Sequence, residues 1–397
     1  MIKIIVAIDS FKGCLTSVEA NQAAAEGILR RIPEATVVQI PVSDGGEGWL
    51  SAFQAAWGGQ LVDVNVCDPL MRPIVAQYLM KDETAVIEIA KASGLTLLSR
   101  EERNPMKATS YGTGQLVVDA VRRGCKHIII GLGGSATSDC GIGMLRAVID
   151  GLTLRGDCSR MEMESNSDIS RIIAAYTDDE MKALDDIHFT IATDVGNPLC
   201  GENGAANVFG PQKGATQEMV RALDDRARRF AEMTARHFGY DCQHEPGAGA
   251  AGGLGYAFLQ FMSRSRRTYS AESLQEGGGV KLGGKDGVEC RPGIDLILDA
   301  IGFEHHLEDA TLVITGEGSA DRQTLMGKLP FGILRRAKGR GVPVVLIAGR
   351  IKDSQRLLDA GFSRVVCINP IGLPIEEAMN PSTAKRNISS LVFRLSD

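Results

Sequence analysis

The chain has 397 residues, of which 44% are apolar and 23% are charged, and its formal net charge is −6. This length predicts two domains, and the composition is typical of a globular protein. The acidic excess disfavours nucleic acid or an anionic membrane surface as a partner, because both select a basic face.

The cysteines and the first residues bear on cellular location. Nine cysteines are scattered singly, with no C-x-x-C pair, which indicates free thiols in a reducing compartment. The opening residues MIKIIVAID lack the long apolar segment and cleavage site of a signal peptide. No run approaches the roughly 18 apolar residues of a membrane-spanning helix. We therefore expect a cytoplasmic protein.

The N-terminal stretch predicts a strand, a helix and a second strand. Residues 2–8 are rich in β-branched side chains and predict a buried parallel strand. Residues 16–31 carry apolar side chains at helical spacing, and Thr16 and Glu19 are spaced as a capping box. Residues 36–42 predict the next strand, so the chain opens with a β/α unit.

The same rhythm continues to the C-terminus. In the middle of the chain, strands are predicted at residues 85–90, 127–130 and 189–192, and helices at residues 112–123 and 215–238. Further on, strands are predicted at residues 311–314, 342–348 and 365–368, with a helix at residues 328–339. Residues 263–292 are polar, glycine-rich and mostly aperiodic, which predicts a loop excursion. Together these elements indicate an α/β protein.

Glycines and acidic residues gather where the predicted strands end. There are 46 glycines in the chain, well above the roughly 7% of an average protein. Ligands of open α/β sheets bind at the carboxyl ends of strands. Any one such end is more often a tight turn than a site, but several together favour a phosphate and metal site. These ends are DSFKG at 9–13, DGGEG at 44–48, GLGGS at 131–135, DVGN at 194–197, GEG at 316–318 followed by Asp321, and AG at 348–349.

Phosphoryl transfer accounts for this composition. It requires a protein mainly to position groups and neutralise charge, and Mg²⁺ is usually held by one or two carboxylates together with phosphates and waters. Three lysines sit beside glycines, where each could meet a phosphate or equally be a solvated surface residue: Lys12, Lys213 and Lys328. A Walker A loop is absent, so the chain is not a P-loop kinase.

A competing pattern lies in the middle of the chain. Residues 131–136 follow a predicted strand and fit G-x-G-x-x-A, with Asp157 about 20 residues further on, as in dinucleotide-binding units. Alone, this pattern supports an NAD-dependent dehydrogenase. The other acidic, glycine-rich strand ends would have no task in hydride transfer, so we favour phosphoryl transfer.

In this order the motifs resemble the glycerate kinase family of bacterial glycerate use (type I, glycerate 2-kinase), nearly from end to end. The segments that carry the resemblance are DSFKG at 9–13, PVSDGGEG at 41–48, YGTGQL at 111–116, GLGGSATSD at 131–139, ATDVGNPLCGENGAA at 192–206, FGPQKGA at 209–215, PGAGAAGGLG at 246–255 and TGEGSADRQTLMGK at 315–328.

The resemblance implies a fold of two α/β domains with the active site in the cleft between them. One domain would be a Rossmann-like, doubly wound parallel sheet built from both chain ends, residues 1–70 plus 293–397. The other would be an inserted α/β domain, residues 71–292, carrying the loop excursion at 263–292.

The resemblance also implies an activity. ATP would phosphorylate D-glycerate with Mg²⁺, mostly at the 2-hydroxyl to give 2-phosphoglycerate, with 3-phosphoglycerate as the alternative product. The family often has glycine where Cys140 stands and arginine where Ser319 stands. These departures keep open a second class of protein, a catalytically silent binding relative.

Motif chemistry and the resemblance together suggest catalytic and metal-binding residues. We expect Asp194 to be the base or orienting carboxylate for the substrate hydroxyl, with Asp44 as its rival. Lys12 would contact the substrate carboxylate or the transferring phosphoryl group. Glu317 and Asp321 would hold Mg²⁺.

A second group of residues is expected to bind the nucleotide. The backbone N–H groups of Gly133, Gly134 and Ser135 would cradle a phosphate, and Lys213 and Lys328 would neutralise phosphate charge. The assignment of each acidic residue to base or metal ligand, the nucleotide preference and the oligomeric state stay open at this point.

Overall fold

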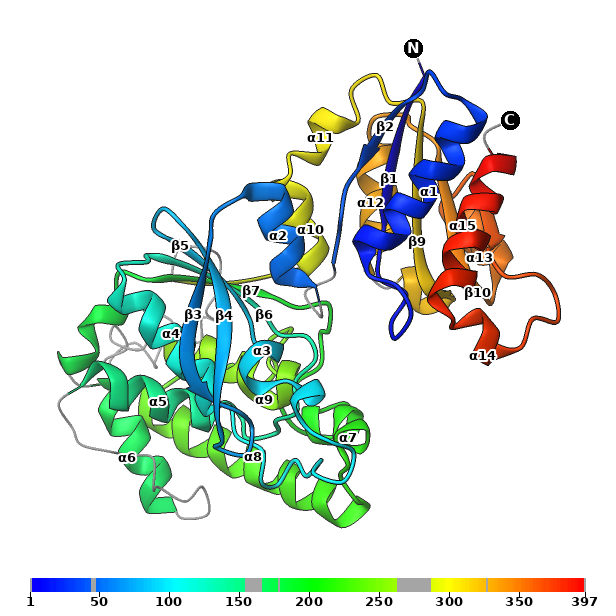
Figure 1. Cartoon of the computed structure of the whole chain (residues 1–397). Helices are drawn as coiled ribbons and strands as arrows, with labels where there is room; N and C mark the ends of the chain where they lie inside the picture. Colours follow the sequence, from blue (N-terminus) through cyan, green and yellow to red (C-terminus); the bar gives the residue numbers. More distant parts are fainter. Residues whose placement is uncertain are drawn as a thin grey trace. The chain divides into compact units, whose positions relative to one another are not determined.

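The computed structural model describes residues 2–43, 48–153, 166–177, 179–262, 287–325 and 328–395 (Figure 1). The chain divides into two compact units, each built around one sheet. Unit 1 comprises Met1–Asp44, Ser51–Gly58 and Pro292–Asp397, and unit 2 comprises Gly45–Leu50 and Gly59–Arg291. None of the helices in the described ranges is long and apolar enough to cross a membrane.

Unit 1 holds a five-stranded, all-parallel sheet in the order β11-β10-β9-β1-β2. Within this unit the order along the chain is therefore 2-1-3-4-5, one of the two common doubly wound arrangements. The doubly wound α/β fold expected from the sequence is confirmed. The strands are β1 (Lys3–Ile8), β2 (Thr36–Gln39), β9 (Leu312–Ala320), β10 (Val344–Ile351) and β11 (Arg364–Cys367).

Helices cover both faces of this sheet. The helices are α1 (Ser17–Arg31), α10 (Gly293–Ala300), α11 (Phe303–His306), α12 (Leu329–Lys338), α13 (Ser354–Ala360), α14 (Ile375–Ala378) and α15 (Pro381–Leu395), with a short turn η7 (Arg322–Leu325). Helix α2 (Trp49–Trp57) crosses the division between the units. Helices α1 and α15 lie side by side on one face, and α12 lies on the other (Figure 1). Alternate residues of β1 (Ile4, Val6 and Ile8) pack into the core beneath α1 and α15.

The start of α1 follows the sequence signal. The Thr16 hydroxyl accepts a hydrogen bond from the Glu19 backbone N–H (3.2 Å), and Glu19 accepts one from the Thr16 N–H (3.0 Å). This is the expected capping box. Lys385 of α15 also bonds the Glu19 carboxylate (2.8 Å), and these hydrogen bonds lower the pKa of Glu19 to about 2.

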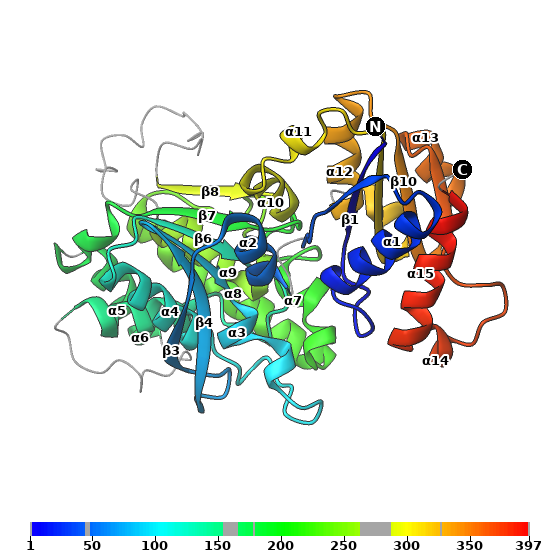
Figure 2. The same ribbon diagram turned by 45° about the horizontal axis from the view of Figure 1, so that its top comes forward.

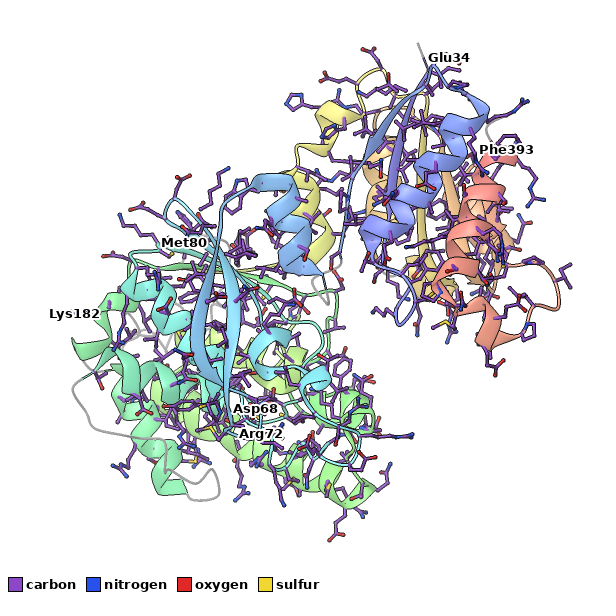
Figure 3. All side chains as sticks on the ribbon, in the orientation of Figure 1. Glu34, Asp68, Arg72, Met80, Lys182 and Phe393 are labelled. Carbon is purple, nitrogen blue, oxygen red and sulfur yellow. The ribbon has the colours of Figure 1, made fainter. Side chains whose placement is uncertain are left out.

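Unit 2 holds a six-stranded mixed sheet in the order β3-β4-β5-β6-β7-β8. The first three strands pair antiparallel, and β5 to β8 pair parallel. The strands are β3 (Gln60–Cys67), β4 (Pro73–Lys81), β5 (Thr84–Glu88), β6 (His127–Gly131), β7 (His188–Ala192) and β8 (Val288–Arg291). At the turn between β3 and β4, the buried Asp68 carboxylate accepts the N–H groups of Leu70 and Arg72 and pairs with the Arg72 guanidinium (Figure 3).

Helices cover one face of this second sheet (Figure 2). They are α3 (Ala90–Ser93), α4 (Tyr111–Arg122), α5 (Ile142–Leu152), α6 (Asn166–Thr177), α7 (Ala205–Phe209), α8 (Gln217–Phe238) and α9 (Ala250–Ala257). The short turns are η1 (Leu95–Leu97), η2 (Asp179–Leu184), η3 (Pro211–Lys213) and the π-helical η4 (Phe258–Met262). Ile128 and Ile130 of β6 pack with Leu116 of α4, Leu145 of α5 and Phe230 of α8 in one core.

The structure differs from the sequence expectations at three places. Residues 59–70, expected in the first domain, lie in unit 2, because β3 pairs along its whole length with β4. Strand β9 runs on to Ala320, where a loop was expected after residue 314. Strand β8 lies inside the expected loop excursion at 263–292, of which residues 263–286 fall outside the described residues.

Candidate active site

The sheet of unit 1 reverses its strand order between β1 and β9. From β1 the chain passes to β2 on one side, whereas β9, β10 and β11 follow one another on the other side. In doubly wound sheets, ligands bind outside the carboxyl ends of the strands at this switch point, because the connecting helices diverge there. The fold alone therefore marks the loop after β1 and the end of β9.

A pocket of about 430 Å³ lies at this switch point. Its floor is formed by the loop after β1, which crosses close over β9 and β10. Glycine is required at position 349, because a Cβ there would lie 2.8 Å from the Gly318 carbonyl oxygen of β9, and a Cβ on either Gly318 or Gly349 would lie 3.6 Å from Phe11, in ordinary contact. The polar lining residues are Asp9, Ser10, Lys12, Glu317, Ser319, Lys328, Arg350 and Asn369.

Glu317 is one of two buried carboxylates that line this pocket, with a relative exposure of 7%, and Asp9 is the other at 8%. Its Oε1 accepts a hydrogen bond from the Thr324 hydroxyl (2.5 Å), and its Oε2 lies 3.6 Å from the Lys328 ammonium. Burial raises the pKa of Glu317 above its usual range; Thr324 and Lys328 oppose this rise, and the neighbouring Asp321 adds to it. A cation beside Glu317 would relieve the cost of burying this charge.

Asp321 directly follows β9 and forms hydrogen bonds within the turn that comes next. Its Oδ1 accepts the Gln323 N–H (2.8 Å), and its own N–H donates to the Thr324 hydroxyl (3.0 Å), so it begins η7. Asp321 is not among the pocket-lining residues. Within the described ranges, no group of three or more His, Cys, Asp or Glu side chains is arranged to hold a metal. Glu317 with Asp321 nearby still fits Mg²⁺, which takes most of its ligands from phosphates and waters.

The positive charges of the pocket come from three elements. Lys12 is exposed in the loop after β1, Lys328 caps the start of α12, and Arg350 is exposed near the end of β10. The Lys12 ammonium and the backbone N–H groups of Lys12 and Gly13 bond to none of the described residues. These donors are therefore available to an anionic ligand.

The second set of predicted residues lies at the carboxyl ends of β6 and β7 in unit 2. Gly133, Gly134 and Ser135 follow β6, and Gly134 has φ +72°, a left-handed conformation that glycine adopts readily. No residue that the structure describes accepts a hydrogen bond from these three backbone N–H groups. Successive free N–H groups around a left-handed glycine form a concavity suited to anions.

Lys213 supports this loop from inside the protein. It is 3% exposed, and its ammonium donates to the Ser135 hydroxyl (2.9 Å) and to the Thr137 carbonyl (2.6 Å). Burial lowers the pKa of Lys213 to about 7, although the nearby Asp139 favours the charged form. The structure therefore places Lys213 as a buried support of the loop, in contact with Ser135.

The other end of the same loop is fixed by Asp139, which the sequence did not single out. Its buried carboxylate accepts hydrogen bonds from the Ser110 N–H (2.8 Å), the Ser110 hydroxyl (2.9 Å) and the N–H groups of Gly141 and Gly143 (both 3.1 Å). Arg226 donates to the Ser138 carbonyl (3.1 Å). Residues 135–143 are therefore held rigidly, as a preorganised site requires.

The predicted residues thus form two sets. Lys12, Glu317 and Lys328 line the unit 1 pocket, with Asp321 close to Glu317. In unit 2, Ser135 contacts Lys213, while the half-buried Asp194 follows β7, the strand beside β6. Asp44 lies outside the described residues.

Sequence reasoning missed two charged residues that line the unit 1 pocket and one residue that holds Glu317. Asp9 and Arg350 line the pocket, and Thr324 holds Glu317. Asp9 begins the motif at 9–13, and Arg350 directly follows the motif at 348–349. Both would have been found if every polar residue at the end of a predicted strand had been taken as a candidate. Thr324 gave no signal, because its role depends on the turn of η7.

The dinucleotide alternative does not fit the geometry at β6. That motif requires the glycine-rich turn to open a helix directly, with the pyrophosphate at the helix N-terminus. Here α5 begins only at Ile142, after a loop in which Cys140 has φ +54°. Asp157, the expected ribose ligand, lies outside the described residues.

Comparisons with known proteins agree with the sequence motifs. The model of the glycerate kinase family matches residues 4–395. The chain is 38% identical to glycerate kinase of Bacillus subtilis (strain 168), over 95% of this chain and 92% of that protein. It is 37% identical to glycerate 2-kinase of Escherichia coli (strain K12), over 98% and 97%. A solved structure of glycerate kinase 2 from Salmonella typhimurium LT2 is similar with a TM-score of 0.74 at 35% identity, over 100% and 97% of the two chains.

The family match spans nearly the whole chain, and the two named relatives are matched over 92% and 97% of their length. The expected family is therefore confirmed. The chain belongs to the glycerate kinase family and is an enzyme of the phosphotransferase class.

Proposed function

We propose that this enzyme transfers the γ-phosphoryl group of ATP to the 2-hydroxyl of D-glycerate, with Mg²⁺, and releases 2-phosphoglycerate. The observation that carries the proposal is the family match over residues 4–395. The name of the Escherichia coli relative, glycerate 2-kinase, supports the position of transfer. The eight described cysteines are unpaired, which supports a cytoplasmic location.

Glu317 and Asp321 would hold the magnesium ion, directly or through water. When bound, Mg²⁺ neutralises phosphate charge and orients the phosphates for in-line transfer. Glu317 suits this role because it is buried, keeps one oxygen facing Lys328, and carries a charge that burial disfavours. Asp321 supports it as a second negative charge close by.

Lys12 and Lys328 would neutralise anionic oxygens in the unit 1 pocket. Lys12 has no partner among the described residues, and Lys328 is only 3.6 Å from Glu317, so both can turn to a phosphate without breaking a tight ion pair. Lys12 could equally receive the substrate carboxylate, since both groups present paired oxygens.

In unit 2, the N–H groups of Gly133, Gly134 and Ser135 would cradle a phosphoryl group. Phosphoryl transfer gains most from fixed donors aimed at oxygen, because these need no reorganisation during the reaction. Lys213 would contribute from below by fixing Ser135.

Asp194 would accept the proton of the glycerate hydroxyl or orient that hydroxyl. A carboxylate that begins the loop after a parallel strand is well placed for this, because the strand fixes its backbone. Asp44 remains the rival for this role.

The test is a coupled assay of ADP release with D-glycerate and a panel of other small hydroxy-acids. We expect turnover with ATP and Mg²⁺ that is highest for D-glycerate. Release of ADP with none of the acids would favour a catalytically silent relative. Preference for a different hydroxy-acid would contradict the assignment of D-glycerate as the substrate, but the assignment to phosphoryl transfer would stand.

A further inference from the structure

The unit 1 pocket has a second side, which the proposed roles of the charged residues leave unused. Besides the cations, apolar side chains line it, mostly from the segment that follows β11. These residues are Ile368, Ile375, Ala378 and Met379, together with Phe11 and Cys14. A site for a small polar acid alone has no need of such a wall.

Two of these apolar side chains are exposed on one face of a short helix. Ile375, the first residue of α14, is 67% exposed, and Met379, which ends that helix in helical conformation, is 41% exposed. Because they are four residues apart, their side chains lie on the same side of the turn. Met379 also reaches the loop after β1, because a Cβ on Gly13 would lie 3.5 Å from its methyl group. Together with the buried Ile368 and Phe11, Ile375 and Met379 give the pocket a continuous apolar part, which is typical of ligand-binding sites.

The size of the pocket excludes glycerate as its sole occupant. A volume of about 430 Å³ lies within the roughly 300–1,000 Å³ of pockets that bind drug-sized molecules. Glycerate has only three carbons and four oxygens, all close to a polar group. Glycerate alone would leave the apolar lining of the pocket in contact with water and would not fill most of the volume.

We propose that this pocket binds the nucleoside half of the phosphoryl donor, with the base and ribose against Ile368, Ile375 and Met379 and the phosphates directed to Lys12 and Lys328. A nucleoside triphosphate matches both sides, because it joins a flat, largely apolar base to a polyanion. The assignment rests on the proposed function for the identity of the donor as a nucleotide.

The position of the pocket supports the same orientation. It lies at the switch point between β1 and β9, where doubly wound sheets bind nucleotides. The N–H groups of Lys12 and Gly13, which bond to none of the described residues, lie in the loop after β1, so they add phosphate donors on the polar side. Asp9 and Glu317 would repel bare phosphate, but a magnesium ion carried by the nucleotide removes that repulsion.

The experiment measures binding of ADP with Mg²⁺ by calorimetry, without glycerate, to the full chain and two variants. The test variant combines Ile375→Ala and Met379→Ala, and the control is Ile371→Ala, a fully exposed isoleucine of the same segment that does not line the pocket. We expect the double variant to bind ADP roughly tenfold or more weakly, from lost apolar contact, and the control to match wild type.

Inorganic tripolyphosphate serves as the second probe. Its affinity should be the same in all three proteins, because it has no base, whereas Lys12→Met should weaken both ligands. An unchanged ADP affinity in the double variant, or an equal loss for tripolyphosphate, would overturn the assignment. Since glycerate is absent, a selective loss of ADP supports the pocket even if glycerate is not the acceptor. No ADP binding by wild type would overturn pocket and proposed function together.

Discussion

At the scale of single residues, Glu317 is the clearest case of function set against stability. Its carboxylate is buried, with only Thr324 in close hydrogen bond and Lys328 at 3.6 Å. Its pKa is raised in the folded state, so the folded protein holds this proton to a higher pH than the unfolded chain. The stability it contributes is present below the ordinary glutamate pKa and is lost as pH rises through the folded value.

Glu317→Gln should therefore raise the melting temperature at neutral pH, and the gain should vanish towards pH 4, where the wild-type group is neutral as well. The same change should raise the Mg²⁺ concentration for half-maximal activity by roughly 10–100-fold. Thermal melts at several pH values and a magnesium titration measure these effects. An unchanged magnesium titration would remove Glu317 from the metal site.

Lys213 offers a second residue-scale prediction. Its pKa falls to about 7 in the folded state, from an ordinary lysine value of 10.5, because burial disfavours the ammonium. Between these values the unfolded chain binds one more proton, so this group makes the protein more stable as pH rises from 7 towards 10. Lys213→Met should lose that slope and also weaken turnover, because Ser135 is no longer held.

Chemical denaturation of wild type and variant at pH 6.5 and 9.5 measures the difference. The free energy of unfolding of wild type, relative to that of Lys213→Met, should be larger at pH 9.5 than at pH 6.5. The exposed Lys107→Met should show no such change. A pH-independent difference for Lys213→Met would show that the ammonium is solvated or paired, contrary to the buried geometry.

Asp194 carries the catalytic prediction at this scale. Asp194→Asn should lower kcat by about 10²–10⁴-fold, the range for a positioned base, with a smaller effect on the KM for glycerate. Asp186→Asn, an exposed aspartate just before the same strand, is the matched control and should leave turnover unchanged. Wild-type turnover by a folded Asp194→Asn protein would transfer the role to another carboxylate.

At the scale of elements, close contact between α1 and α15 organises one face of the unit 1 sheet. A Cβ at Gly27 of α1 would overlap the Ser389 carbonyl of α15. Helix propensity alone favours alanine over glycine by about 1 kcal/mol. The packing here should reverse that sign, so Gly27→Ala should lower the free energy of unfolding by about 1–3 kcal/mol.

Denaturant titration measures this change. Gln22→Ala, at an exposed position of the same helix, should be close to neutral. If Gly27→Ala stabilises the protein, the two helices cannot lie as close as the structure shows.

The elements also show what could be predicted and why the rest could not. β-Branched runs predicted β1, β6 and β7, because buried parallel strands leave a plain apolar signal. Strands β3 and β4 were not predicted, because the exposure of their residues alternates only in part and each strand is defined by pairing with the other. Long-range pairing is invisible to local patterns.

Glycine was the main source of error. The run from Thr315 to Gly318 suggested a loop, yet it continues β9, because β10 pairs with it as far as Ala320. A Cβ on Gly316 would overlap the Ile347 carbonyl, so that glycine serves close strand packing. The glycines of residues 246–255 similarly include Gly252, whose carbonyl accepts the Cys140 N–H (3.0 Å) and steadies the loop after β6.

For the site residues, the sequence predicted their location in the fold better than the role of each side chain. It placed Lys213 with the nucleotide-binding residues, and the structure buries that lysine under Ser135. Burial of a lysine depends on the surrounding fold and leaves no local trace. Glu317, in contrast, was selected by its strand-end motif, and it is a buried carboxylate that lines the pocket.

At the scale of the whole molecule, the residues proposed for phosphoryl transfer are divided between the two units. Unit 1 has a pocket of about 430 Å³ lined by cations and by the buried carboxylates of Asp9 and Glu317. Unit 2 has a loop after β6 whose backbone N–H groups at residues 133–135 bond to none of the described residues, and Asp194 follows the neighbouring strand β7. Neither set alone contains phosphate donors, a metal ligand and a candidate base. Under the proposed function, this division accounts for the recurrence of glycine-rich, acidic strand ends along the chain.

The central claim is tested most directly by phosphorus NMR of the product formed from ATP, Mg²⁺ and D-glycerate. We predict a single phosphate ester with the signal of 2-phosphoglycerate, growing in step with ADP. Formation of 3-phosphoglycerate would contradict the position of transfer. The absence of any phosphorylated glycerate, from protein that still binds ADP, would contradict the proposed function itself.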